Sequence, residues 1–323
     1  MRWLLRVAGA VAFAEVLRHA DLRGAWTLAA AAGPVLALGL APYLVQIALD
    51  ALAWRTLLAA LGHRLAWARL VRVRLGTEAV LLTLPGGSLV GESLKPVLLA
   101  KHAPVSDVVA SVAVKRALLA AAESVYLWIA LAAAHDYLAA AAPHVVAHLP
   151  LLVGIAAAIL LAAAIGLGLA FASAGLAARA HALLTRLPIR RLRDALATRR
   201  DGFAATDEAL VAIGRHRARL AAAWLLLLAA WLVEFGETYL LLRLVGVSLP
   251  PAAVLGMEAA VVFARNAAVF VPAGLGVQDA GYLAFLGAYG IVAAPAAAFV
   301  LVKRVKELVW IAVGYASLAG GAA

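Results

Sequence analysis

Cysteine is absent from this 323-residue chain, and charged residues are scarce. Without cysteine the protein has no disulfide, thiolate metal site, iron–sulfur cluster or cysteine nucleophile. Charged residues make up 14% of the chain and apolar residues 66%, against about 25% and about 45–50% in an average soluble domain. Because a soluble core of this size leaves much of its surface in water, we expect lipid to surround most of this chain.

Lysine and acidic residues are also few. Only five of the 28 basic residues are lysines, there are 17 acidic residues, and the formal net charge is +11. In a chain this apolar, an excess of basic residues favours loops that face anionic lipid headgroups over nucleic-acid binding. We therefore expect the protein to bind membrane lipids and not nucleic acid. Formation of a homo-oligomer is a further alternative.

Apolar stretches predict a membrane protein with several crossings. A spanning helix needs about 20 mostly apolar residues. Five stretches qualify or nearly so, namely residues 27–49, 108–134, 150–172, 220–245 and 296–318. A sixth, residues 3–17, contains Arg6 and Glu15 and lacks a clear signal-peptide cleavage site. It is either a weak first span or an interfacial helix.

Arginine is concentrated in two segments. Residues 179–219 contain ten arginines, and residues 55–74 contain five more. Leucine and alanine between the arginines of residues 179–219 predict amphipathic helices on the membrane surface. The positive-inside rule places both segments in the cytoplasm, and residues 135–149, without Lys or Arg, outside. If residues 3–17 cross the membrane, both termini are cytoplasmic.

Two further apolar regions, residues 70–102 and 251–294, are interrupted by proline and glycine. Their centres read Pro85-Gly-Gly-Ser88 and Pro272-Ala-Gly-Leu-Gly276. Proline and clustered glycine stop helices, and broken backbone persists in lipid only where protein or water satisfies it. Each region is predicted to form two short helices joined at a buried break, a re-entrant hairpin. Two kinked ordinary spans are the alternative.

The broken regions belong to an internal repeat. Each half contains a Pro-x-Gly break, an acidic residue seven positions after the proline, and a Lys-Arg doublet 30 or 31 positions after it. These residues are Pro85, Gly87, Glu92, Lys115 and Arg116 in one half, and Pro272, Gly274, Asp279, Lys303 and Arg304 in the other. Equivalent residues of the two halves are separated by an odd number of predicted membrane crossings. The second half is therefore predicted to have the opposite orientation in the membrane. Such inverted repeats with broken helices are typical of transporters.

The predicted fold is therefore all-α, a polytopic membrane protein with two inverted-topology repeats, each with a broken or re-entrant helical hairpin. Residues 1–26 form the N-terminal weak span or interfacial helix, and residues 27–135 form repeat 1. Residues 136–219 contain a linking span and the basic cytoplasmic amphipathic segment. Residues 220–323 form repeat 2.

Both Lys-Arg doublets lie inside predicted spans. A charge at the bilayer centre costs about 2.5–3.5 kcal/mol on insertion scales, so these side chains face a polar interior or pair with each other. Internal pairing, such as Lys303 with Glu307 at i,i+4, is the structural alternative. Such pairing would still leave the excess positive charge of two Lys-Arg doublets in the membrane. An excess of this kind favours an anionic ligand, and arginine can bind phosphate through two hydrogen bonds.

The helix N-termini at the breaks favour the same ligand, because free N–H groups and the positive dipole end attract anions. Glu92 and Asp279 are predicted to pair with the doublets and release them when substrate arrives. Glu78 and Arg265, seven residues before each proline, are predicted to face each other across the pseudo-twofold axis. The predicted ligand-binding set is Lys115, Arg116, Lys303, Arg304, Glu92, Asp279, Gly86, Gly87, Ser88, Gly274 and Gly276. The gating or coupling candidates are Glu78, Arg265, Glu123, Glu234, Glu237, Glu307, Pro85 and Pro272.

Other chemical motifs are weak. His144 and His148 have helical metal-ligand spacing, but they lie in a predicted outside loop between two prolines. The chain has no Walker loop, dinucleotide fingerprint or G-x-S-x-G elbow. We therefore expect no metal, no cofactor and no enzymatic activity.

Several motifs together resemble a known family. Asp50-Ala-Leu-Ala-Trp-Arg55, Pro85-Gly-Gly-Ser-Leu-Val-Gly-Glu-Ser-Leu-Lys95, Val114-Lys-Arg116 and Pro272-Ala-Gly-Leu-Gly-Val-Gln-Asp279 look like the flippase-like membrane family. This family is related to the transmembrane half of lysylphosphatidylglycerol synthases, and the likeness covers nearly the whole chain. The stretch Asp50–Arg55 is similar to the branch associated with hopanoid biosynthesis. The family usually has Glu where this chain has Asp279, and it often has an arginine near Lys95.

The resemblance implies lipid translocation between leaflets of a bacterial inner membrane. The expected substrate is an anionic phospholipid, a polyprenyl-phosphate lipid or a hopanoid. We expect no aminoacyl-transferase domain after residue 323, and therefore no lipid aminoacylation by this chain alone. Three alternatives stay open, namely a lipid-binding accessory protein of a hopanoid or other lipid pathway, a membrane-embedded lipid-modifying enzyme, and a solute transporter with the same plan.

Overall fold

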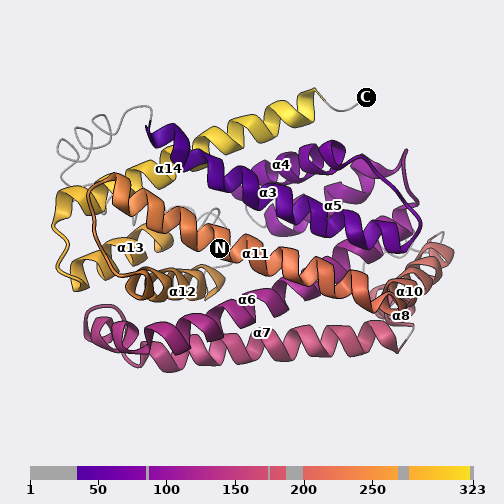
Figure 1. Cartoon of the computed structure of the whole chain (residues 1–323). Coiled ribbons are helices and arrows are strands. Elements are labelled where there is room, and N and C mark those ends of the chain that lie inside the picture. The colour runs from indigo at the N-terminus through magenta and orange to yellow at the C-terminus, as the bar shows by residue number, and fades with distance from the viewer. Residues whose placement is uncertain (1–34, 85–86, 174, 187–198, 268–275, 321–323) are drawn as a thin grey trace.

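A computed structural model describes residues 35–84, 87–173, 175–186, 199–267 and 276–320, and every regular element in these ranges is helical (Figure 1). The long helices are α3 (Val35–Ala60), α6 (Val105–Ala141), α7 (Leu149–Ala172), α11 (Arg217–Leu244) and α14 (Ala293–Ala319). The shorter ones are α4 (Trp67–Thr83), α5 (Gly87–Leu99), the single 3-10 turn η1 (Ala142–His144), α8 (Leu176–Thr185), α10 (Arg200–Arg215), α12 (Pro251–Ala267) and α13 (Val277–Ala288).

Four of the long helices, α3, α6, α7 and α11, contain stretches long and apolar enough to cross a membrane. All five predicted spans correspond to long helices, but the predicted end of the first span at residue 49 is wrong. Helix α3 continues to Ala60, because the charge of Asp50 pairs inside the protein rather than ending the span. Helix α14 has the length of a span but places four charged residues near its middle, between Lys303 and Glu307. Residues 1–26, the predicted N-terminal element, lie outside the described ranges.

Both interrupted regions form two helices, as predicted. Helices α4 and α5 pack against each other, and so do α12 and α13. Gly87 begins α5, and Gly276 precedes α13 with a φ of 79°, a conformation that glycine adopts without steric cost. Pro85, Gly86, Pro272 and Gly274 lie outside the described residues, as does the side chain of Ser88. Whether the pairs are re-entrant, and where the repeat boundaries fall, stay predictions.

The two halves of the chain meet along α3 and α11, which lie side by side (Figure 1). Gln46 of α3 donates to Glu234 of α11 at 2.9 Å, and Arg219 donates to the carbonyl of Ala59. Because contacts move down α11 as they move up α3, the two helices are antiparallel. A Cβ on Gly39 would lie 2.5 Å from a methyl carbon of Leu241, so glycine permits this close approach.

A second contact between the halves joins α4 and α14. A Cβ on Gly314 would lie 2.5 Å from the carbonyl oxygen of Leu75 and 2.7 Å from the Cβ of Ala79. The backbones therefore approach each other more closely than any larger residue permits. At the far end of α4, the hydroxyl oxygens of Thr83 and Tyr315 lie 2.5 Å apart.

Helix α7 forms an outer layer against α6 (Figure 1). The two are antiparallel, and the Ser124 hydroxyl donates to the carbonyl of Ala157 at 2.7 Å. Much of the remaining surface of α7 is apolar and exposed, as Ile159 and Leu169 illustrate. Exposed apolar side chains on a long apolar helix indicate a face in contact with lipid.

The arginine-rich segment contains the predicted helices, α8 and α10, within its described parts. Both lie at the end of the molecule where α11 begins (Figure 1). Asp207 of α10 accepts hydrogen bonds from the N–H groups of Ala177 and Ala178, at 2.7 and 2.9 Å. This carboxylate caps the N-terminus of α8 and fixes it to α10.

Candidate functional site: a buried network of ion pairs

The interior contains a network of ion pairs that we call the charge network. Among the described residues it joins equal numbers of basic and acidic side chains. The basic members are Arg74, Lys95, Lys115, Arg116, Arg265, Lys303, Arg304 and Lys306, and the acidic members are Asp50, Glu78, Glu92, Glu234, Glu237, Glu258, Asp279 and Glu307. Pairing of this kind offsets the cost of removing each charge from water.

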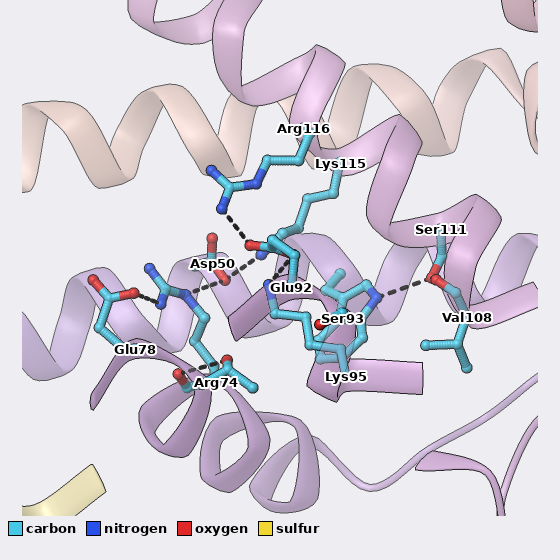
Figure 2. Close-up of polar contacts among 12 residues, drawn as sticks. Asp50, Arg74, Glu78, Glu92, Ser93, Lys95, Val108, Ser111, Lys115 and Arg116 are labelled. Atoms are coloured by element: carbon cyan, nitrogen blue, oxygen red, sulfur yellow. Dashed lines mark hydrogen bonds and ion pairs between the residues drawn. The ribbon is translucent and has the colours of Figure 1, made fainter. Parts of the chain in front are cut away.

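In the first half, formed by α3 to α6, Asp50 binds two cations (Figure 2). The Lys115 ammonium donates to its carboxylate at 2.6 Å, and the Arg74 guanidinium donates to it at 2.9 Å. Arg74 also donates to Glu78 one turn later in α4. Lys115 has only 3% of its side chain exposed, so its charge depends on these protein partners.

A second carboxylate of the first half, Glu92 of α5, is also shared by two cations. Lys95 donates to one carboxylate oxygen at 2.6 Å, and Arg116 of α6 donates to the other (Figure 2). The indole of Trp54 lies beside both lysines, 5.5 Å from the Lys95 ammonium and 5.7 Å from that of Lys115. Its N–H donates to Ser111 at 3.0 Å, which fixes the ring for these cation–π contacts.

In the second half, formed by α11 to α14, Arg304 binds Asp279 through two parallel hydrogen bonds of 2.8 Å each. The same carboxylate accepts the Gly276 N–H at 3.0 Å, which caps the start of α13. Arg304 also donates to Glu307. Asp279 is 1% exposed, so the carboxylate of this two-point pair is removed from solvent.

Lys303 lies at the centre of the second half. Its ammonium donates to Thr238 at 2.6 Å and to Glu258 at 3.4 Å, and it lies 3.8 Å from Glu237. Tyr282 donates to Glu258 at 2.8 Å. Lys306, one turn later in α14, donates to Glu237.

Between the halves, Glu234 of α11 links the network across the interface. It accepts from Gln46 of α3 at 2.9 Å and lies 3.5 Å from Arg265 of α12. Next to Arg265, the Asn266 amide donates to Glu123 of α6 at 2.5 Å. Two adjacent sets of polar contacts therefore join these helices: one links α3, α11 and α12, and the other links α12 and α6.

The arginines of the two Lys-Arg doublets bind acids at equivalent sequence positions. Glu92 and Asp279, predicted as partners, pair with Arg116 and Arg304, which confirms the predicted pairing. The lysines are matched only in part. Lys115 binds Asp50 at 2.6 Å, whereas Lys303 lies 3.4 Å from Glu258 and 3.8 Å from Glu237, the counterpart of Asp50. Asp50 and Glu237 are 187 residues apart, the same separation as Glu92 and Asp279.

Two predictions about these charges are wrong within the described part of the chain. Glu78 does not pair with Arg265, because Arg74 binds Glu78 and Glu234 binds Arg265. The doublets also do not leave an overall excess of positive charge, since α3, α11 and α12 supply carboxylates. The balance differs between the halves: the first has one more base than acids, and the second has one more acid than bases.

The internal pairing considered for Lys303 and Glu307 is also absent among the described contacts. Arg304 binds Glu307, one turn apart, while Lys303 points toward α11 and α12. Helical spacing placed Lys303 and Glu307 on one side of α14. The orientation of Lys303 is instead decided by the acids that the neighbouring helices supply.

Five members of the charge network were outside the predicted site, namely Asp50, Arg74, Lys95, Glu258 and Lys306. The repeat separation of 187 residues identifies Asp50 as the counterpart of Glu237. Glu258 interrupts an otherwise apolar helix start, and this is a detectable signal. Arg74 lies in an arginine-rich segment assigned to the cytoplasm, so nothing in the sequence indicates its buried position.

Two arginines of the network remain accessible. Arg116 has 38% of its side chain exposed and Arg265 has 36%, against 3% for Lys115 and 6% for Lys303. Both guanidinium groups keep donors beyond those used by Glu92 and Glu234. These two groups can receive an anion without prior rearrangement of the core.

The fold and this network define a polytopic α-helical membrane protein with an ionic interior. The chain matches the family described as Lysylphosphatidylglycerol synthase TM region over residues 2–314. It therefore belongs to this family and is an integral membrane protein with a membrane lipid-related function. No curated protein and no solved structure gives a significant match.

Proposed function

We propose that this protein is a flippase that moves an anionic, phosphate-bearing lipid between the leaflets of a bacterial inner membrane. The observation that carries the proposal is that the arginine of each Lys-Arg doublet, Arg116 or Arg304, pairs with an acid at the equivalent position of its half. Transporters built from repeats bind substrate between such halves.

The directions of the helices support an inverted repeat. In each half the doublet helix is antiparallel to the first helix, as the pairs Asp50–Lys115 and Trp54–Ser111 define for α3 and α6. The same relation holds for α11 and α14. Since α3 and α11 are themselves antiparallel, the second half runs opposite to the first, which fits alternating access across a twofold axis in the membrane plane.

The lipid phosphate would bind at Arg116 and Arg265. Arginine presents a planar fork that matches two phosphate oxygens, and these are the accessible arginines of the network. Lys115 and Lys303, enclosed by acids, hold the two halves of the site in place in this conformation.

We propose movement rather than chemistry for this site, so the protein is not an enzyme. Cations or amides engage the buried carboxylates described above, so none is positioned as a free base or nucleophile. Facilitated movement down a gradient needs only that these pairs rearrange as one half rocks against the other.

Transport in proteoliposomes tests the proposal. Fluorescent anionic and zwitterionic lipids are reconstituted with the wild type, with an Arg116→Ala/Arg265→Ala variant, or without protein, and the outer leaflet is quenched over time. We expect faster loss of inner-leaflet signal with the wild type, for the anionic probe, and loss of this effect in the variant. Equal rates in all three vesicles contradict the proposal.

The same samples separate the alternatives. A lipid-binding accessory protein, for example of a hopanoid pathway, retains a specific lipid through purification without accelerating its movement. A lipid-modifying enzyme changes the mass of the probe. Either result replaces the transport proposal.

A further inference from the structure

A groove on the outer side of the molecule lies apart from the charge network. It has a volume of about 650 Å³ and runs between α6, α7, α10 and α11. Its walls are small and apolar, with Ala117 and Ala121 from α6 and Ala164 and Gly168 from α7. Small side chains at four positions leave space between helices that otherwise pack closely.

The groove has the depth of one membrane leaflet. Along α7 it extends from Leu161 to Ala172, which is about 16 Å at about 1.5 Å per residue. The hydrocarbon of one leaflet is about 15 Å deep, half of the bilayer core. The groove occupies the half of α7 nearest the arginine-rich end, so it lies in the leaflet on that side.

Two arginines line the groove at its arginine-rich end, nearest the proposed membrane surface. Arg215 ends α10 and Arg217 begins α11, and both are exposed. Neither makes a hydrogen bond or ion pair with another residue in the described part of the chain. In the charge network, by contrast, each arginine has an acidic partner.

We propose that this groove binds one anionic phospholipid of the arginine-side leaflet. An acyl chain lies between α6 and α7, and the phosphodiester binds Arg215 and Arg217. An apolar groove, with guanidinium groups that have no partner among the described residues at its interfacial end, matches the two chemical parts of such a lipid. This site is separate from the proposed transport route and does not depend on it.

Two variants test the two ends of the site. Arg215→Ala/Arg217→Ala removes the phosphate contacts. Gly168→Leu places a leucine side chain in the groove, and its Cβ would meet no atom within 4 Å. Gly166→Leu is the matched control, because it adds the same side chain two residues away, also into open space, but not in the groove. Arg200→Ala in α10 controls for loss of surface charge.

Native mass spectrometry of delipidated protein titrated with phosphatidylglycerol or phosphatidylcholine gives the readout. We expect one high-affinity phosphatidylglycerol, weakened at least tenfold by the arginine variant and by Gly168→Leu, and unchanged in both controls. Glycerol phosphate in excess should not displace it. Equal retention of both lipids by all variants means annular lipid only and overturns the proposal. Displacement by glycerol phosphate identifies a free phosphate site and also overturns it. Thermal unfolding of each variant confirms that it is folded.

Discussion

Asp279 combines two roles, because it binds Arg304 through both oxygens and caps α13 through the Gly276 N–H. Removing one partner of a buried pair typically costs about 3–5 kcal/mol when the other charge is left uncompensated. Because Glu307 still binds Arg304, we expect the lower end of this range, to which loss of the helix cap adds about 0.5–2 kcal/mol. We therefore expect Asp279→Ala to lower the unfolding temperature strongly, and Asp279→Asn less, since an amide oxygen still caps the helix.

Thermal unfolding in detergent measures this difference. Asp136→Ala is the control, because the Asp136 side chain is fully exposed and such changes usually stay within about 0.5 kcal/mol. Equal melting of Asp279→Ala and wild type contradicts a structural role for the pair.

Arg116 provides the opposite case. Its loss leaves Glu92 paired with Lys95, so we expect Arg116→Ala to remain stably folded. Because the proposed phosphate contact is lost, movement of an anionic probe should fall at least tenfold, and Arg116→Lys should recover part of it. Flipping rates and unfolding temperatures measured on the same preparations separate the two roles. A variant that melts early, or that flips at the wild-type rate, contradicts this assignment.

At the scale of single residues, the sequence predicted the two Lys-Arg doublets and the acids that bind their arginines, because a repeat preserves spacing. It did not predict the partners of Lys115 and Lys303. Those acids come from helices far away in sequence, and helical periodicity within α6 or α14 contains no information about them. The predicted excess of positive charge in the interior was wrong for the same reason.

At the scale of helices, the contact of α14 with α4 depends on the small residue Gly314. A methyl group on Gly314 meets the Leu75 carbonyl and Ala79 at distances that real atoms do not adopt. Overpacking of this kind costs about 1–3 kcal/mol, so Gly314→Ala should destabilise the protein and weaken the contact between the halves.

Gly166→Ala is the matched change, since its Cβ enters open space on an exposed helix. It should be neutral or stabilise the protein by up to about 1 kcal/mol through helix propensity. Thermal unfolding of both variants gives the comparison. If Gly314→Ala melts at or above the temperature of Gly166→Ala, the close approach of α4 and α14 is not as described.

Apolar length and proline–glycine breaks predicted the existence of these helices well. The boundaries were less reliable wherever a charged residue is buried. Asp50 appeared to end a span, yet α3 continues past it because Lys115 and Arg74 neutralise the carboxylate inside the protein. Hydropathy alone does not distinguish a charge in water from a charge in a paired interior.

For the whole molecule, the absence of cysteine makes membrane orientation directly measurable. Exposed residues near the two ends, Gly202 of α10 and His144 between α6 and α7, are suitable single-cysteine sites. The positive-inside rule places Gly202 in the cytoplasm and His144 outside. We expect an impermeant thiol reagent to label His144→Cys in intact cells and Gly202→Cys only after lysis. Labelling of both sites from the same side contradicts this orientation.

Transport by this protein is proposed to require that one half rocks against the other. Thr83 and Tyr315 lie next to each other on opposite halves, on α4 and α14. A cleavable thiol crosslinker between Thr83→Cys and Tyr315→Cys would join the halves at this point, and no other cysteine competes.

The most direct test is the rate of anionic-lipid movement in proteoliposomes before crosslinking, after crosslinking and after cleavage of the crosslink. The proposed mechanism predicts that movement stops when the halves are joined and returns when the link is cut, while either single-cysteine variant is unaffected. Movement that continues unchanged in the crosslinked protein would show that lipid crosses without relative motion of the halves at this contact, and would contradict alternating access.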